Sequence, residues 1–165
     1  MKRGVLILAQ GFGIGRVPFA PGTFGSVLGF GLLAVLVAPR SAWFFVVGGL
    51  LSVAVSVWAC GEAEKLMGET DPGSVVLDEI VAIPVCCVGW LFLEQARTGQ
   101  FPGLEQVFGS GRWPVLVSVF GLFRLFDIWK PWPVRGIQDL PGGWGVTMDD
   151  VLAACYVVLV VTWFV

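Results

Sequence analysis

Residues 41–61, SAWFFVVGGLLSVAVSVWACG, form an uncharged run of 21 residues between Arg40 and Glu62. The run before it, residues 17–39, holds 23 uncharged residues. Each run can cross a bilayer once, because about 20 apolar residues of helix span its hydrocarbon core. Of the 165 residues 56% are hydrophobic and 13% are charged, whereas soluble domains are about 45–50% apolar and about 25% charged. The chain is therefore predicted to be embedded in a membrane.

Five apolar segments are candidates for membrane-spanning helices. They cover residues 23–38, 43–60, 75–93, 113–129 and 148–165. Helices are the expected form, because backbone polar groups in lipid must be hydrogen-bonded within the segment. The predicted fold is an all-α, polytopic transmembrane helical bundle with four to five spans. It is expected to form a single integral membrane domain over residues 1–165.

The N-terminal stretch over residues 4–22, GVLILAQGFGIGRVPFAPG, is short, rich in glycine and interrupted by proline. This composition predicts an interfacial or re-entrant segment rather than a full span. No small-residue cleavage site follows it, so it is expected to be retained. Its glycines and Arg16 can offer backbone N–H groups and charge to an anion. The GK[ST] signature of a P-loop is missing, and no nucleotide site is predicted.

Composition excludes several classes of site. Ten Lys and Arg against 12 Asp and Glu give a net charge of −2, which argues against nucleic acid as a partner. The chain has no histidine, so a zinc site and a phosphatase that uses a histidine nucleophile or base are not expected. All four cysteines lie in apolar segments and are interpreted as packing residues: Cys60, Cys86, Cys87 and Cys155.

The distribution of basic residues predicts the orientation. With five crossings and a cytoplasmic amino terminus, seven Lys and Arg lie on or just inside the cytoplasmic side and three lie outside, as the positive-inside rule requires. The cytoplasmic set is Lys2, Arg3, Arg16, Lys65, Arg124, Lys130 and Arg135. The outer set is Arg40, Arg97 and Arg112.

The same topology predicts that acidic residues converge. The third and fifth segments begin, and the fourth ends, at the cytoplasmic face. Ionisable groups inside spanning segments are costly and indicate a functional site. Together the carboxylates form a candidate site for a divalent cation, which prefers oxygen ligands. The six acids are Asp71, Asp78, Glu79, Asp127, Asp149 and Asp150.

Local patterns leave alternatives open for two of these acids. Asp71 and Asp78 are seven residues apart and share a helix face if one helix begins near Asp71. Alternatively, Asp71 caps that helix ahead of Pro72. In residues 142–150, GGWGVTMDD, Thr147 is predicted as an N-cap with Asp150 at the third helical position.

Basic residues accompany the fourth segment. Arg124, Asp127 and Lys130 are spaced three apart, so on one helix they form a cation–anion–cation ladder. The ladder is either a set of ion pairs at a helix end or part of a phosphate site. A phosphate-bearing substrate requires acids to hold a metal and basic groups to bind phosphoryl oxygens.

Four sequence blocks resemble those of the phosphatidylglycerophosphatase A family. They are GRVPFAPGTFGS at 15–26, TDPGSVVLDEIVA at 70–82, FRLFDIWKPWPVR at 123–135 and GGWGVTMDDVLAA at 142–154. The blocks occur in the family's order and cover nearly the whole chain. The resemblance implies a Mg²⁺-dependent integral enzyme of the bacterial inner membrane, and the topology predicted from the basic residues puts its active site toward the cytoplasm. Such an enzyme removes the terminal phosphate of phosphatidylglycerol phosphate during phospholipid biosynthesis.

The resemblance implies that the residues of its blocks with ionisable side chains are functional positions: Asp71, Asp78, Glu79, Asp127, Lys130, Asp149 and Asp150. The charges of the side chains then predict a role for each, and Arg16 and Arg124 are added as binders of phosphate. The metal set is Asp78, Glu79, Asp127, Asp149 and Asp150, and the catalytic set is Asp71, Asp78, Glu79, Asp127 and Lys130. The phosphate-binding set is Arg16, Arg124 and Lys130. In the predicted reaction a metal-polarised water attacks phosphorus, with a spare carboxylate such as Asp71 as the base or as the group that positions the water. An aspartyl-phosphate intermediate is the alternative.

Two other function classes fit a small membrane protein with buried acids. A transporter or channel uses such acids to bind a cation or proton, usually near the bilayer midplane. The acids of this chain instead lie within about two turns of the predicted helix ends, which favours the enzyme. An assembly subunit, the other class, has no catalysis to lose. The segment IQDLP at 137–141 departs from the family pattern and makes a role for Asp139 doubtful.

Overall fold

The computed structural model describes residues 2–164, and within that range it is all-helical with no strand. The predicted all-α class is confirmed. Residues 1 and 165, the ends of the predicted domain, lie outside the described range. The elements are α1 Lys2–Ala9, the 3₁₀ turn η1 Gly11–Arg16, α2 Pro21–Val37, α3 Ala42–Met67, α4 Leu77–Cys86, α5 Val88–Thr98, α6 Leu104–Phe108, α7 Trp113–Trp129, α8 Val134–Ile137 and α9 Gly143–Phe164.

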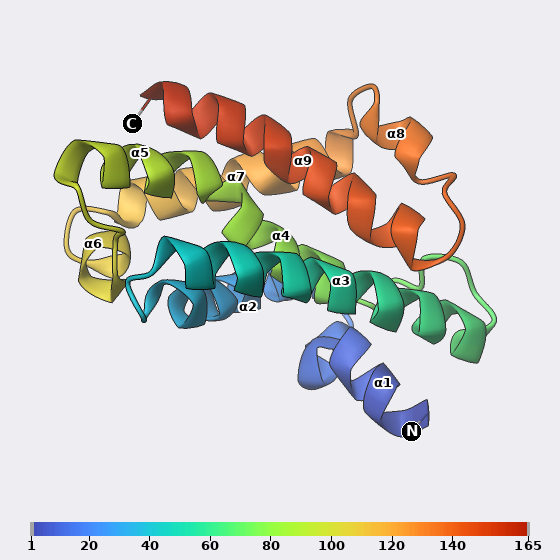
Figure 1. Cartoon of the computed structure of the whole chain (residues 1–165). Helices are drawn as coiled ribbons and strands as arrows, with labels where there is room; N and C mark the ends of the chain where they lie inside the picture. The colour runs from blue at the N-terminus through green and yellow to red at the C-terminus, as the bar shows by residue number, and fades with distance from the viewer. Residues whose placement is uncertain (1, 165) are drawn as a thin grey trace.

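Helix α4 is the centre of the bundle. It contacts α2, α3, α7 and α9, and Figure 1 shows it between α9 above and α2 and α3 below. Most of α4 is buried, including Ile80, Ala82 and Ile83. The start of α9 and the end of α7 lie at the same end of the bundle as α8 (Figure 1). Side chains near these helix termini can therefore meet around the first turn of α4.

Four of the five predicted apolar segments form single helices, α2, α3, α7 and α9. The third segment, residues 75–93, was predicted as one helix, and this is wrong: α4 ends at Cys86 and α5 begins at Val88. Pro84 lies inside α4, where it lacks an N–H and disturbs the helix. The N–H of Cys87 then donates to the Pro84 carbonyl at 3.2 Å, a tighter turn than an α-helix makes.

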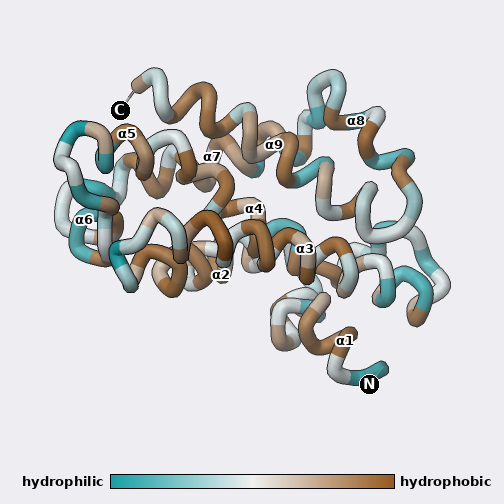
Figure 2. Tube along the Cα trace, viewed as in Figure 1, coloured by the Kyte–Doolittle hydropathy of each residue, from teal (hydrophilic) through white to brown (hydrophobic). Residues whose placement is uncertain are grey.

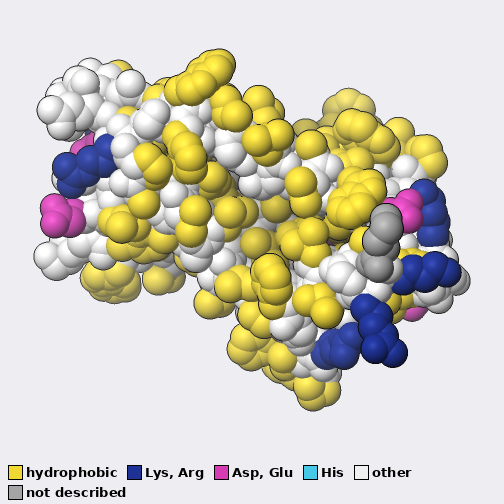
Figure 3. Space-filling model, turned by 60° about the horizontal axis from the view of Figure 1, so that its bottom comes forward, with side chains coloured by type: hydrophobic (Ala, Val, Ile, Leu, Met, Phe, Trp, Pro, Cys, Tyr) yellow, Lys and Arg dark blue, Asp and Glu magenta, His cyan; other side chains and the backbone are white. Residues whose placement is uncertain are grey.

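Two helices in the described range, α3 and α9, are long and apolar enough to cross a membrane. In the most apolar 18-residue window of α3 only 22% of residues are buried. Exposed apolar side chains on this helix include Trp43, Leu50 and Trp58. Figure 2 shows hydrophobic residues along the helices and hydrophilic ones toward the two ends, and Figure 3 shows the charged side chains of one face gathered at those ends. Four to five spans stay a prediction.

The N-terminal segment forms short helical turns rather than a span. Helix α1 has eight residues, too few to cross a bilayer. The segment is tied to the start of α4, because the Val76 N–H donates to the Ala9 carbonyl at 2.9 Å. A side chain on Gly15 would overlap the backbone of Ser74. An interfacial location for this segment stays a prediction.

Helices α3 and α9 cross at small residues. A Cβ on Gly61 would lie 2.9 Å from the Gly143 nitrogen, and Ser56 Oγ lies 3.0 Å from Thr147 Oγ1. Helix α9 begins at Gly143, so these contacts lie in its first two turns. The prediction that Thr147 is an N-cap is wrong, since Thr147 and Asp150 lie inside the helix. Capping therefore does not account for Asp150.

Candidate active site

The first turn of α4 supplies two acids, Asp78 and Glu79. Leu77, Ile80 and Val81 are buried in the core and hold this turn in place. Asp71 lies six residues before the helix, in the left-handed region with φ 49°. Both predictions for Asp71 are therefore wrong: it neither shares a helix face with Asp78 nor caps α4.

An acidic cluster of three residues joins α4 to α9. Asp78, Glu79 and Asp150 each offer one oxygen, and these oxygens lie within 4.8 Å of one another. Asp78 is 6% exposed and Asp150 is 3% exposed. Asp78 Oδ1, Glu79 Oε2 and Asp150 Oδ2 are buried without a hydrogen-bond partner in the described part of the chain. We refer to these three residues as the acidic cluster.

The acidic cluster fits a divalent cation. The three neighbouring carboxylates repel one another, and Asp78 and Asp150 are buried while Glu79 is partly buried. A buried charge is costly unless it is paired or coordinates a metal. The unpartnered oxygens are available as ligands. Because oxygen atoms alone make up the donor set, it suits a hard cation such as Mg²⁺ rather than a thiophilic metal.

Arg124 and Asp127 lie beside the acidic cluster, on the last turns of α7. Arg124 Nη1 is 2.8 Å from Asp127 Oδ2 and 3.8 Å from Glu79 Oε1. The Arg124–Asp127 rung of the predicted ladder is thus confirmed. Arg124 Nε is buried without a hydrogen-bond partner among the described residues. The guanidinium therefore keeps a donor for an anion at the edge of the acidic cluster.

Lys130 does not continue the ladder. It is the C-cap of α7 with φ 47°, and its Nζ lies 2.6 Å from Asp149 Oδ2. Burial alone would lower the pKa of Lys130, but the hydrogen bond to Asp149 and the nearby carboxylates raise the pKa above its ordinary value. The ammonium is therefore charged at neutral pH.

Asp149 stands apart from the acidic cluster although it neighbours Asp150 in sequence. Its Oδ2 accepts hydrogen bonds from Lys130 and, at 3.0 Å, from Gln138 Nε2. Its Oδ1 accepts the backbone N–H of Asp150 at 3.0 Å. The two acids of the GGWGVTMDD block thus have different surroundings.

The first turn of α2 also approaches the acidic cluster. A Cβ on Gly22 would overlap Glu79 Oε1 and would lie 3.2 Å from Arg124 Nη1. From the sequence, Gly22 was predicted only as one of several glycines that could offer backbone N–H groups to an anion, and no role was predicted for Gln138. The pattern GRVPFAPGTFGS was the available signal for Gly22. Nothing in IQDLP marked Gln138.

Two predicted site residues have other contacts. Arg16 is exposed and donates from Nε to Gln10 Oε1 at 2.8 Å. Asp71 is exposed, and its backbone N–H donates to Glu64 Oε1 at 2.9 Å. Of the four cysteines, Cys155 is exposed, so the packing interpretation agrees with the structure only for the other three.

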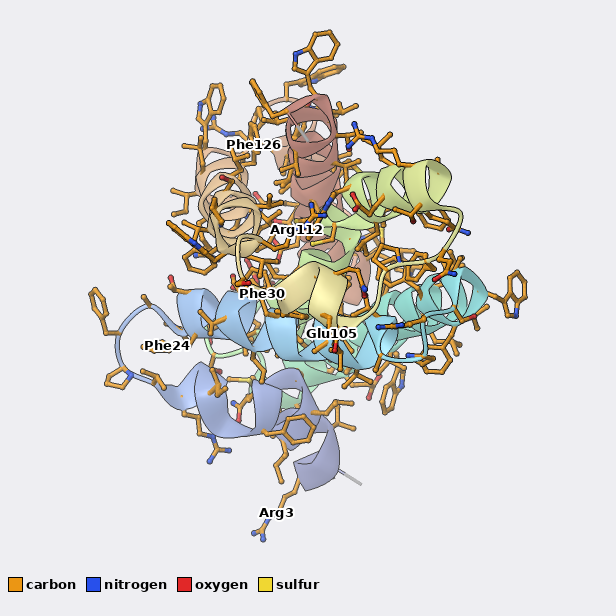
Figure 4. The ribbon with its side chains drawn as sticks, turned by 90° about the vertical axis from the view of Figure 1, so that its left-hand side faces the viewer. Arg3, Phe24, Phe30, Glu105, Arg112 and Phe126 are labelled. Atoms are coloured by element: carbon orange, nitrogen blue, oxygen red, sulfur yellow. The ribbon has the colours of Figure 1, made fainter. Side chains whose placement is uncertain are left out.

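The charges at the opposite end of the bundle are paired with one another. Arg112 Nη2 lies 2.9 Å from Glu94 Oε1, and Arg40 Nη2 lies 3.7 Å from Glu105 Oε2. Figure 4 views the molecule from this end, with Arg112 and Glu105 labelled. The acidic cluster and its basic neighbours are thus confined to one end of the molecule.

Comparison with known proteins identifies relatives over nearly the full chain. A family model described as Phosphatidylglycerophosphatase A matches residues 7–165. The chain is 36% identical over 156 residues to Phosphatidylglycerophosphatase A of Haemophilus influenzae, covering 94% of this chain and 85% of the relative. It is 32% identical over 149 residues to Phosphatidylglycerophosphatase A of Escherichia coli, covering 89% of this chain and 75% of the relative.

A third relative carries a different name. The chain is 35% identical over 156 residues to a Bacteroides thetaiotaomicron protein provisionally named a phosphatidylinositol-3-phosphatase, covering 92% of this chain and 87% of the relative. No solved structure matches the chain. The relatives are thus named for phosphatases that act on phosphate groups of different lipids.

Proposed function

This chain belongs to the phosphatidylglycerophosphatase A family, and on that basis we propose that it hydrolyses phosphatidylglycerol phosphate to phosphatidylglycerol and inorganic phosphate. The reaction is Mg²⁺-dependent and serves phospholipid biosynthesis. The observation that carries the proposal is the acidic cluster of Asp78, Glu79 and Asp150, with unpartnered buried oxygens and a guanidinium beside it.

The acidic cluster would hold the cation. Asp78, Glu79 and Asp150 supply carboxylate oxygens, and Asp127 lies close enough for its charge to act on both Glu79 and Asp150. When bound there, Mg²⁺ supplies Lewis-acid polarisation of the phosphoryl group and activation of a water molecule. The site has no histidine to share this role, so the carboxylates carry it.

Arg124 orients the phosphoryl group of the substrate. Its guanidinium is held by Asp127 at 2.8 Å, and its Nε–H, which has no acceptor among the described residues, is available to the substrate. Arginine binds phosphate oxygens in a planar geometry, and the positive charge counters the negative charge that develops at phosphorus. Lys130, fixed by Asp149, adds a second positive charge near the same end of α7.

The proton of the attacking water passes to a carboxylate of the site. Asp71, predicted from the sequence as the base or water-positioner, lies exposed in the connection between α3 and α4. Asp127 lies beside the acidic cluster and keeps an oxygen outside its ion pair with Arg124, so we assign the proton to Asp127. Direct attack by a carboxylate on phosphorus is the alternative route, and trapping with hydroxylamine distinguishes the two because only an acyl phosphate yields a hydroxamate.

We further propose that the chain is a multi-pass protein of the bacterial inner membrane, a single domain with its active site toward the cytoplasm. The uncovered apolar side chains of α3 support embedding in lipid, because contiguous exposed apolar surface is unfavourable in water. In this arrangement the acyl chains of the substrate stay in the bilayer while the head group reaches the helix termini around α4.

Phosphate release by the purified protein in detergent tests the proposal. The substrates are phosphatidylglycerol phosphate, phosphatidic acid and phosphatidylinositol 3-phosphate, each with Mg²⁺ and then with EDTA. We expect release that requires Mg²⁺ and is fastest from phosphatidylglycerol phosphate. Preference for phosphatidylinositol 3-phosphate would reassign the substrate. No release from any lipid by folded protein, together with ion flux in vesicles, would favour the transporter.

A further inference from the structure

Asp149 and Asp150 are neighbours on α9, but only Asp150 has a buried oxygen without a hydrogen-bond partner among the described residues. Asp149 is 3% exposed, and both of its oxygens accept hydrogen bonds. Asp150 is also 3% exposed, yet its Oδ2 has no partner in the described range and belongs to the acidic cluster. Burial is thus equal, whereas the capacity to bind a cation is not.

The two side chains leave the helix in different directions. Consecutive residues of an α-helix are rotated by about 100°, so Asp150 faces α4 while Asp149 faces the connection between α7 and α9. Tyr156, seven residues after Asp149, lies on nearly the same face of α9. Its hydroxyl donates to the Trp132 carbonyl at 2.8 Å.

The connection from residue 130 to residue 142 is therefore held to α9 at three points. Asp149 binds Lys130 at its start and Gln138 near its end, and Tyr156 binds the backbone of Trp132 between them. Lys130 donates one of its three ammonium hydrogens to Asp149, which leaves two for another acceptor.

We propose that Asp149 is a positioning residue and not a ligand of the metal: its carboxylate fixes Lys130 and residues 130–142 next to the acidic cluster, so that the Lys130 ammonium meets the anionic head group. This inference rests on the proposed function only for the identity of that head group. The separation of Asp149 from the cation site is independent of the substrate.

Paired substitutions on α9 test the assignment by cation binding alone. Asp149→Asn and Asp150→Asn each remove one carboxylate, and thermal unfolding in detergent is followed as Mg²⁺ is added. Binding to the native state stabilises it by mass action. We expect Asp149→Asn to keep the Mg²⁺-induced shift in unfolding temperature and Asp150→Asn to lose it. Loss of the shift in Asp149→Asn as well would overturn the proposal.

Kinetics of phosphate release then test the positioning role. For Asp149→Asn we expect the half-saturating Mg²⁺ concentration to stay within about twofold of wild type and the lipid kcat/KM to fall by about tenfold, mostly through KM. The double variant Asp149→Asn/Lys130→Met should have about the same kcat/KM as Lys130→Met alone, because either change removes the Lys130–Asp149 interaction. Full additivity of the two losses would contradict the role.

Milder variants cover the case in which Asp149→Asn does not fold. Tyr156→Phe and Gln138→Leu each remove a single hydrogen bond to the same connection. Tyr156→Phe should raise the lipid KM by about threefold, the loss expected for one neutral hydrogen bond, and Gln138→Leu should raise it by at least as much, because its hydrogen bond is to a charged carboxylate. Both should leave the Mg²⁺ shift unchanged. An altered Mg²⁺ shift with an unaltered KM in both variants would overturn the proposal. Wild-type protein that binds Mg²⁺ but releases no phosphate would refute the proposed function while leaving the first test intact.

Discussion

Gly22 and Glu79 are in such close contact that residue 22 has no room for a side chain, because a Cβ there would overlap Glu79 Oε1. The contact joins the first turn of α2 to the first turn of α4 across 57 residues of sequence. The atom in the way is the end of a flexible side chain, so a methyl group displaces the carboxylate rather than the helix. Glycine at this position therefore determines where the Glu79 oxygens lie.

Gly22→Ala is expected to lower kcat for phosphate release by about tenfold or more, equivalent to about 1.4 kcal/mol of the activation free energy. The loss follows from displacement of one cluster carboxylate in a protein that still folds. Gly31→Ala, on the same helix, is the matched control, since its Cβ would meet nothing closer than Leu28 Cδ1 at 3.9 Å. Equal activity of the two variants would show that the contact between Gly22 and Glu79 does not affect turnover.

Asp78→Asn is expected to abolish turnover, by at least about 100-fold, because the amide keeps the shape but is a weaker ligand for a hard cation. In EDTA the same variant should unfold at a higher temperature than wild type, since it relieves repulsion among buried carboxylates. Thermal unfolding and phosphate release measure the two effects. Asp139 is an exposed acid, so Asp139→Asn serves as the control and should leave both the rate of phosphate release and the unfolding temperature unchanged.

Arg124→Lys is expected to reduce kcat/KM by about 10- to 100-fold, because lysine cannot reproduce the planar donor geometry toward Asp127 and a phosphoryl group. Arg112→Lys is the matched control: Arg112 also pairs with a carboxylate, Glu94 at 2.9 Å, but at the opposite end of the bundle. Initial rates over a range of lipid concentrations check both variants. A loss of equal size in Arg112→Lys would point to stability rather than phosphate binding.

Gly143→Ala is expected to destabilise the fold by about 1–3 kcal/mol, the usual cost of overpacking. The added methyl group would overlap the Val57 carbonyl of α3, and backbone cannot move aside as a side-chain end can. Denaturant unfolding in detergent measures the change. Gly136→Ala, where nothing lies within 4 Å of the added Cβ, should leave the unfolding midpoint unaltered.

Labelling with a membrane-impermeant thiol reagent checks the proposed orientation. New cysteines at two exposed positions, Ser110→Cys and Asp139→Cys, are introduced into a Cys155→Ser background, in which the remaining thiols are buried. In intact cells only the cysteine at position 110 should react, while that at position 139 should react after the membrane is opened. The reverse pattern would place the acidic cluster outside the cytoplasm.

Much of the helical framework was predictable from local sequence. Charge-free runs and acidic residues at segment ends located α2, α3, α7 and α9, because apolar length and helix-terminal charge are local properties. Helix α4 ends at Cys86 with Pro84 inside it, and this break was missed although the proline is visible in the sequence. The start of α9 was placed five residues late, at residue 148 instead of Gly143, where the helix begins in close contact with Gly61 of α3.

The sequence by itself determined that the acids and their basic neighbours lie at one end of an apolar helical bundle, because helices of similar length that alternate in direction bring their charged termini to common ends. Only the tertiary structure decided which acids meet. Asp78, Glu79 and Asp150 converge, whereas Asp149 turns to Lys130 and Asp71 stays exposed. The rotation of each helix about its axis is set by packing between residues far apart in the chain, and no spacing within one segment encodes it.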